Sequence, residues 1–148
     1  MKRLIILLAI VTACGCAQSA ASQRDDGSLD LTTLYDRLGG RPAIAAVVDG
    51  FVAKVAGDKR VNRYFWNTNV PELKELLVEM ICQATGGPCQ YTGRDMKTAH
   101  AGMNIQPSEF TAVVEDLVSV LDRLHVAAHE QHQLLALLAP TKKDIVGQ

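Results

Sequence analysis

The most informative segment of this sequence for the fold is YTGRDMKTAHAGM, at residues 91–103. It sets one histidine, His100, among small apolar neighbours, after a glycine-rich break and before a long amphipathic segment. A neutral imidazole in this setting is a satisfied core histidine, a catalytic base, or the single axial ligand of a metal or haem iron. The residues on either side of this stretch separate the three alternatives.

The first residues predict export from the cytoplasm. Lys2 and Arg3 precede an apolar run at 4–13 that is too short to span a bilayer, and small residues follow it, as in a secretory signal. VTAC at 11–14 resembles the lipobox of bacterial lipoproteins, in which the cysteine becomes the lipidated first residue. We therefore expect a signal peptide at 1–13 and a membrane anchor on Cys14, with Cys16 as a second candidate. The alternative is cleavage near residues 17–21, which releases a soluble periplasmic protein.

Composition limits what the remaining chain does. Removal of residues 1–13 changes the formal net charge from −1 to −3, because Lys2 and Arg3 are lost, so nothing attracts nucleic acid. Residues 14–30 are small and polar, which is typical of a flexible tether; the part at 17–30 would reach about 20 Å as a random coil. Residues 31–148 are enough for one compact domain.

Apolar residues recur at helical spacing through nearly the whole domain, and no strand-like alternation interrupts them, so we expect an all-α fold. Glycines lie where helices would end, and prolines lie where helices would begin or be broken. The apolar stripes lie at 31–38, 44–55, 73–81, 110–124 and 134–138; glycine pairs lie at 39–40 and 86–87; prolines begin helices near Pro42, Pro71 and Pro107, and Pro140 should end or kink the last.

The segment that bears His100 is too weakly hydrophobic to hold itself in a helical bundle. Long polar or glycine-rich passages lie at 67–69 and 83–98, and the only apolar neighbours of the histidine are Met96, Ala99 and Met103. Such a segment needs something else to order it. A bound planar apolar cofactor would do so.

From about residue 34 to 146 the chain resembles the group I truncated haemoglobins, which are bacterial and protist two-over-two globins. The resemblance rests on several motifs taken together, each of which is weak alone. They are LYDRLGG at 34–40, Phe65, TNVPELK at 68–74, GGP at 86–88 and MKTAHAG at 96–102. The resemblance implies a two-over-two helical sandwich around haem b, iron protoporphyrin IX.

The resemblance also implies roles for individual residues. His100 matches the proximal iron ligand, with Met96 beside it, and Phe65 matches the phenylalanine against the porphyrin face. Other matches are Leu73 and Leu77 on the distal wall, Phe51 and Val52 facing the bound gas, and Thr68, Tyr91 and Lys97 at the haem propionates. A hydroxyl, a phenol and a cation suit carboxylates. The alternative for these last three is solvated surface.

One departure from the family affects the expected gas chemistry. Group I proteins commonly carry a tyrosine at the position of Val52 and often a glutamine at or near Leu73 or Leu77, and these donors bond bound oxygen. Here all three are aliphatic. Tyr64 and Gln83 are other polar candidates, but neither lies at a matching position.

The remaining histidines and cysteines give two further expectations. His129 and His132 form an i, i+3 pair near His125, but without a third ligand of fixed spacing solvated surface is the better interpretation. Cys82 and Cys89 bracket the glycine reversal, and in an oxidising compartment such a pair tends to form a disulfide. The alternative is two free buried thiols.

Three functions remain to be separated. The first is reversible binding of oxygen, nitric oxide or carbon monoxide at five-coordinate haem iron, for transport, scavenging or sensing. The second is an enzyme that turns over nitric oxide or peroxide; it needs an external reductase, since the chain has no flavin or nicotinamide motif, and a peroxidase would want a distal acid-base residue. The third is a cofactor-free helical interaction module. The colour of the purified protein distinguishes the third from the others.

Overall fold

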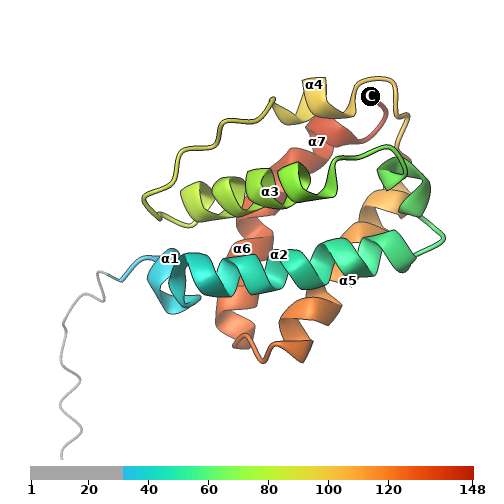
Figure 1. Ribbon diagram of the computed structural model, residues 1–148. Helices are drawn as coiled ribbons and strands as arrows, with labels where there is room; N and C mark the ends of the chain where they lie inside the picture. The colour runs from blue at the N-terminus through green and yellow to red at the C-terminus, as the bar shows by residue number, and fades with distance from the viewer. Residues whose placement is uncertain (1–31) are drawn as a thin grey trace, which may run out of the picture. The chain divides into compact units, whose positions relative to one another are not determined.

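The computed structural model describes residues 32–148, which are mostly helical (Figure 1). The all-α prediction is confirmed: within the described residues the only β pairing is one isolated bridge between Ile105 and Val146. The expected signal peptide, the anchor on Cys14 and the tether fall outside the described residues. The elements are α1 (Leu34–Arg37), α2 (Gly40–Gly57), η1 (Asn62–Phe65), α3 (Val70–Ala84), α4 (Met96–His100), α5 (Pro107–Arg123), α6 (Ala128–Leu138), η2 (Ala139–Thr141) and α7 (Lys142–Ile145).

Helix starts follow local capping chemistry. The side chain of Asn69 caps α3 by accepting from the backbone N–H of Glu72, and proline occupies the first turn of both α3 and α5, where the N–H groups have no helical partner. α2 begins at Gly40, two residues before Pro42, because Gly39 and Gly40 take positive φ angles of 94° and 71°. The chain thereby passes from α1 into α2 through a turn at residues 38–39.

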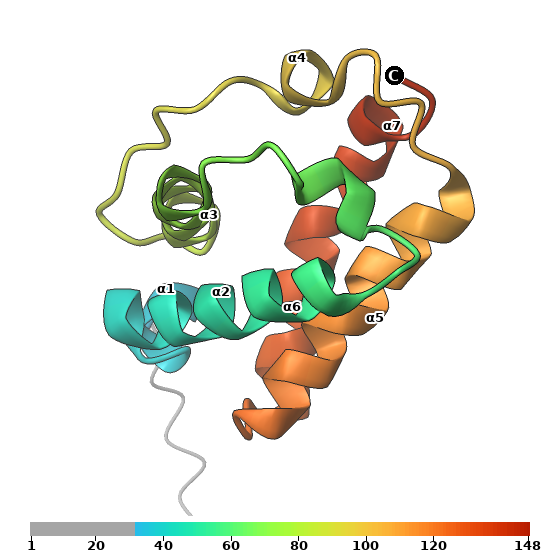
Figure 2. The same cartoon turned by 45° about the vertical axis from the view of Figure 1, so that its right-hand side comes forward.

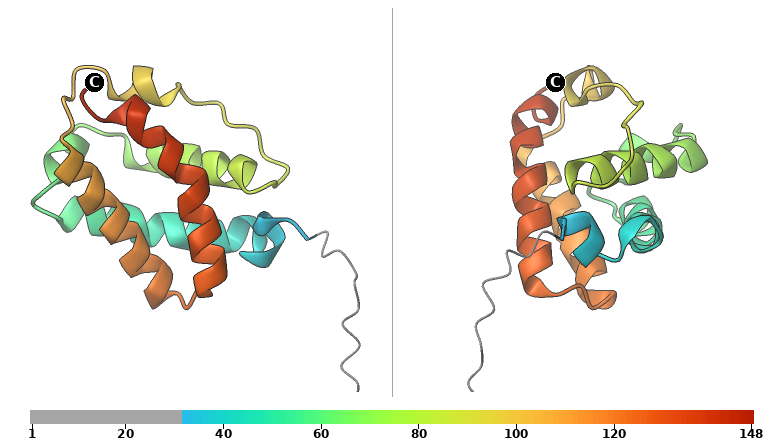
Figure 3. Two further views of the ribbon diagram at one scale, coloured as in Figure 1. Left: turned by 180° about the vertical axis from the view of Figure 1, so that it is seen from behind. Right: turned by 90° about the vertical axis from the view of Figure 1, so that its left-hand side faces the viewer.

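The helices form two layers. α2 and α3 pack together in one layer, and α5 and α6 form the other; Figure 2 shows α3 above α2, and Figure 3 shows α5 and α6 from behind. This is the two-over-two arrangement expected from the sequence. The loop after α3 runs back along that helix to the short α4, which packs against α7 near the end of the chain (Figure 1).

Apolar side chains from both layers meet in the main core. Burial of this surface is the main favourable term in folding. Its buried members are Leu34, Ile44, Val47, Val48, Val52, Val78, Ile81, Cys82, Leu117, Val120, Leu121 and Leu134. A second, smaller cluster of Val55, Val61 and Ala112 supports η1 through Tyr64 and Phe65.

None of the described helices is both long enough and apolar enough to cross a membrane.

Candidate functional site

His100 is the last residue of α4, a helix of five residues. Asp95 caps this helix: its carboxylate accepts from the Thr98 N–H at 2.9 Å and from the Thr98 hydroxyl at 2.7 Å, and these bonds lower the pKa of Asp95. Gly102, with a φ of +80°, lies just beyond the helix end. The short helix is therefore defined by its flanking residues, with no buried side chain of its own.

The ring of His100 is held by one hydrogen bond. Its Nδ1 lies 2.7 Å from the carbonyl oxygen of Met96, an arrangement in which Nδ1 carries the proton and donates. The other ring nitrogen, Nε2, then has a free lone pair, and no side chain or backbone group of residues 32–148 bonds it. The side chain is half-buried. A fixed tautomer with a free Nε2 is the form in which histidine binds a metal.

The residues expected on the two haem faces come from four different elements. Val52 of α2 is 4% exposed and belongs to the main core. The others are only half-buried although they are large and apolar: Phe51 (α2), Phe65 (η1), Leu73 and Leu77 (α3), and Met96 (α4). The protein itself leaves these side chains incompletely covered.

The three residues expected at haem propionates differ in their contacts. Tyr91 donates its hydroxyl to the carbonyl of Arg94 at 2.7 Å, so its only proton is already used; burial raises the pKa of this phenol and keeps it protonated. Lys97 is exposed, and no ion pair to it occurs among residues 32–148. Thr68 is half-buried beside η1, where its N–H donates to the carbonyl of Phe65.

A charged cluster fixes η1, the element that carries Phe65. Tyr64 donates its hydroxyl to Glu109 at 2.7 Å, and Arg63 forms an ion pair with the same carboxylate. The backbone N–H of Gln106 also donates to Glu109, and together these bonds lower the pKa of Glu109. The pKa of Tyr64 is raised, first by burial and then by its bond to Glu109. Sequence reasoning missed this cluster, although the Q-x-x-E spacing at 106–109 resembles a capping box.

Of the two other polar candidates for a distal donor, Tyr64 gives its only hydroxyl proton to another residue, and Gln83 is an exposed side chain whose amide oxygen is bonded to the loop. The hydroxyl of Tyr64 donates to Glu109 and accepts from Arg63. The carbonyl oxygen of the Gln83 side chain accepts from the backbone N–H of Tyr91 at 2.6 Å. Val52, Leu73 and Leu77, the positions expected on the distal side, are aliphatic and have no hydrogen-bond donor in their side chains.

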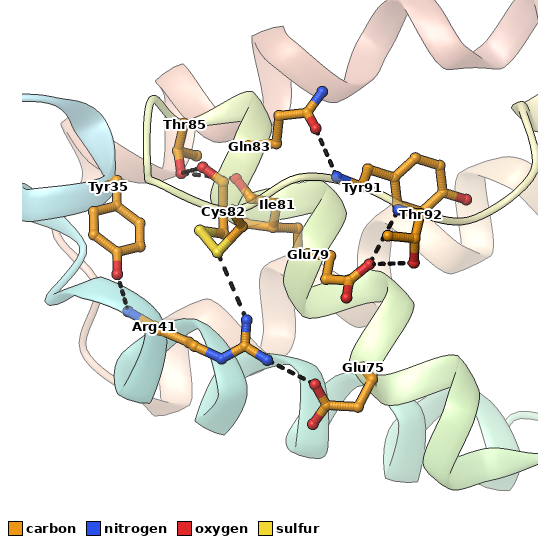
Figure 4. The surroundings of a disulfide bond; sticks show 11 residues. Tyr35, Arg41, Glu75, Glu79, Ile81, Cys82, Gln83, Thr85, Tyr91 and Thr92 are labelled. Carbon is orange, nitrogen blue, oxygen red and sulfur yellow. Dashed lines mark hydrogen bonds and ion pairs between the residues drawn. A yellow bond between two sulfur atoms is a disulfide. The ribbon is translucent and has the colours of Figure 1, made fainter.

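Two contacts hold the His100 segment from either side: the first includes the disulfide predicted from the sequence, and the second was not expected. Before it, the loop is joined to α3, with a disulfide between Cys82 and Cys89 (Figure 4). After it, the chain from 146 to 148 runs alongside 104–105: Gly147 N–H donates to the carbonyl of Ile105 at 3.0 Å, and Asn104 N–H donates to Gln148. Ile105 is buried in this contact.

Two other features lie apart from this site. His129 bonds Gln133 through Nε2 at 3.0 Å, and residues 32–148 contain no cluster of three histidine, cysteine or acidic side chains able to hold a metal ion. A cavity of about 200 Å³ lies at the N-terminal half of α2, between that helix and the ends of α3, α5 and α6. None of the residues expected to contact haem lines it.

Comparison with known proteins identifies the fold. Residues 33–146 match the model of the bacterial-like globin family. The group 1 truncated hemoglobin of Tetrahymena thermophila is 36% identical over 116 residues, which cover 78% of this chain and 96% of the relative. GlbN of Mycolicibacterium paratuberculosis, also a group 1 truncated hemoglobin, is 34% identical over 113 residues, 76% of this chain and 83% of that one.

A solved structure agrees with both sequence matches. The truncated hemoglobin from Tetrahymena pyriformis in its Fe(III) form has a TM-score of 0.76 and 34% identity, covering 79% of this chain and all of the other. The expected two-over-two globin fold is therefore confirmed. The chain belongs to the bacterial-like globin family, and the relatives it matches are group 1 truncated hemoglobins.

Proposed function

We propose that this protein holds haem b between α3 and α4, with Nε2 of His100 as the proximal iron ligand, and reversibly binds a diatomic gas. Membership of the family implies haem-based gas binding. The observation that carries the assignment is the geometry of His100, whose Nδ1 is committed to Met96 while Nε2 is free. Haem iron held by one histidine supplies an open coordination position for a small gas.

The surrounding side chains fit a flat apolar group. Phe51, Phe65, Leu73, Leu77 and Met96 are half-buried, so each leaves apolar surface that the protein does not cover. Covering such surface is favourable by about 25 cal/mol for each Å² removed from water. Lys97, which is exposed, supplies a cation for the propionates. Tyr91 contributes only by packing, because its proton is donated to Arg94 and a propionate carboxylate has no proton to give.

The distal wall supports a preference among gases. Oxygen bound to ferrous haem carries partial negative charge, which a hydrogen-bond donor stabilises, whereas carbon monoxide gains less. Val52, Leu73 and Leu77 supply no donor, the hydroxyl proton of Tyr64 goes to Glu109, and Gln83 is exposed, with its oxygen bonded to the Tyr91 N–H. We therefore infer fast oxygen release, ready oxidation to the ferric form and a bias toward carbon monoxide or nitric oxide, which favours sensing or scavenging over oxygen storage.

We also propose that the protein acts outside the cytoplasm. The disulfide between Cys82 and Cys89 supports this location, because disulfides persist mainly in oxidising compartments. A lipid anchor on Cys14 would keep it at the membrane surface.

Replacement of the ligand tests the haem assignment. We expect His100→Ala to abolish stable haem retention or to leave the haem exchangeable, and added imidazole to restore a five-coordinate spectrum, because imidazole replaces the missing side chain. The measurement is haem content and absorbance spectrum after gel filtration. His132→Ala, at an exposed position, is the matched control and should behave as wild type. Unchanged haem content and spectrum in His100→Ala would rule out the assignment.

A further inference from the structure

The disulfide closes a reversal that only glycine permits. Cys82 lies near the end of α3 and is fully buried, and Cys89 follows seven positions later. Gly87 lies between them with its N–H donating to the carbonyl of Cys82 at 2.8 Å. A Cβ at Gly87 would come within 2.7 Å of the Cys82 sulfur and 2.5 Å of the Tyr35 ring. The turn is thus packed against the crosslink.

After Cys89 the chain is bonded back onto α3, as Figure 4 shows. Tyr91 N–H donates to the side-chain oxygen of Gln83 at 2.6 Å. The N–H and hydroxyl of Thr92 donate to Glu79 at 3.1 and 2.8 Å. Glu79 and Gln83 are four residues apart and so lie on one face of the helix. The loop is therefore attached at three successive points, at positions 82, 83 and 79 of α3.

These attachments set the path to α4. Residues 89–95 form no helix or strand, and none of them is buried. Thr92 is the last residue of the loop that is bonded to α3. Gly93, Arg94 and the cap residue Asp95 are the three residues between it and Met96, the first residue of α4. α4 itself has no buried residue, so its position depends on the segments that flank it and on its packing against the short α7. On the C-terminal side the flanking tie is the Ile105–Val146 bridge.

We propose that the Cys82–Cys89 disulfide positions the haem-binding segment, so that haem is retained tightly when the bond is closed and released faster when it is reduced. This inference rests on the proposed role of His100. Reduction by a dithiol breaks the S–S bond and leaves two thiols, while the dithiol gives up two electrons and two protons and closes into its own disulfide. The chain would thereby take up haem firmly only after its thiols are oxidised.

The test compares haem loss in the two redox states. The oxidised full chain, the same protein reduced with dithiothreitol, and Cys82→Ser/Cys89→Ser are loaded with haem and mixed with excess apomyoglobin as haem acceptor. We expect the reduced protein and the double variant to transfer haem about tenfold faster than the oxidised protein. The upper limit is roughly 60-fold, which is the ratio that corresponds to the entropy of closing an eight-residue loop. The double variant must not respond to dithiothreitol.

A second measurement needs no haem and separates positioning from general stability. Hydrogen exchange of the apo-protein should rise at residues 89–100 on reduction and stay unchanged in α2 and α5. Leu134→Ala, in the core of α6, is the matched control: it should speed exchange throughout the domain without preference for that loop.

Two outcomes would overturn the proposal. One is the same rate of haem transfer in oxidised and reduced protein. The other is exchange that rises equally in α2, α5 and the loop, which would make the crosslink a general stabiliser. If neither redox state takes up haem while exchange still rises only at 89–100, then the function proposed above is wrong and the disulfide positions this segment for something other than haem.

Discussion

If haem binds as proposed, Val52 is the residue whose identity bears most directly on gas selectivity. It is buried in α2, at the position where group I truncated haemoglobins commonly have tyrosine. We expect Val52→Tyr to slow oxygen release by about tenfold for each 1.4 kcal/mol of hydrogen-bond energy gained, with little change for carbon monoxide. Stopped-flow and flash-photolysis rates measure both gases.

Replacement by phenylalanine controls for the added ring. Val52→Phe adds similar volume without the hydroxyl, so only the difference between the two variants reports the donor. The contradicting result is slow oxygen release by the wild type, at a rate that Val52→Tyr leaves unchanged. That result would mean that another residue donates the hydrogen bond to oxygen, and the inference that the distal side lacks a donor would be wrong.

Asp116 is a second residue with an unusual position. It is 3% exposed in α5, and its Oδ2 has no hydrogen-bond partner. Burial raises its pKa above 3.8, and the nearby Asp58 raises it further, while Lys54 and Arg60 act in the opposite direction. A raised folded pKa means that the stability contributed by the protonated form is complete below about pH 3.8 and is lost as the pH rises through the folded pKa.

We therefore expect Asp116→Asn to be more stable than the wild type at pH 7, with the advantage disappearing toward pH 4. Each unit of pKa difference between the folded and unfolded chain corresponds to about 1.4 kcal/mol. Urea unfolding at several pH values measures this. Asp49→Asn is the control at an exposed position. A variant less stable than wild type at pH 7 would show that the folded protein favours the charged form of Asp116.

Among the contacts between elements, the cluster around Glu109 joins η1 to α5 and is the one whose contribution to stability is tested most directly. Glu109 accepts from Tyr64 and Gln106 and pairs with Arg63, and its pKa is lowered from 4.5. The corresponding stability is present above about pH 4.5 and is lost as the pH falls through the folded pKa. We expect Glu109→Gln to be less stable than wild type at pH 7 and to lose less stability on acidification, as measured by urea unfolding from pH 3 to 7.

Glu115→Gln is the matched control, because Glu115 lies on the same helix and its pair with Arg60 is exposed. Exposed pairs contribute little. An acid-unfolding curve of Glu109→Gln parallel to that of the wild type would show that the cluster does not stabilise η1.

The helices themselves were predictable where their starts and stops are local. Asn69 and Pro71 mark the start of α3, and Pro107 begins α5, as the sequence indicates. Pro140 ends α6 as expected, but the chain continues through η2 into α7. That continuation was not predictable, because the contact that orders it is the long-range bridge between Ile105 and Val146.

The residues of the candidate site come from local motifs, whereas the contacts that support them do not. The ligand role of His100 follows from the resemblance of the motif at 96–102 to the family and stays a prediction. The hydrogen bonds of Gln83, Glu79 and Glu109 join segments distant in sequence, and their polar side chains look like solvated surface until the chain is folded. The sequence predicted a cofactor that orders the His100 segment and, separately, the disulfide between Cys82 and Cys89. The structure adds the hydrogen bonds of the loop to α3 and the C-terminal contact.

For the whole molecule, the proposed anchor on Cys14 sets where the domain is held. If Cys14 is lipidated, the protein should partition into detergent and carry a mass increase on its first residue, whereas Cys14→Ser should be soluble or unprocessed. One acyl chain binds membranes only marginally, so stable attachment requires the several chains of a fully modified lipoprotein end. Membrane fractionation with intact-mass measurement tests this.

Cys16→Ser is the matched control and should stay with the membrane. Recovery of unmodified protein that begins beyond Cys16 would exclude the anchor and leave the soluble periplasmic alternative.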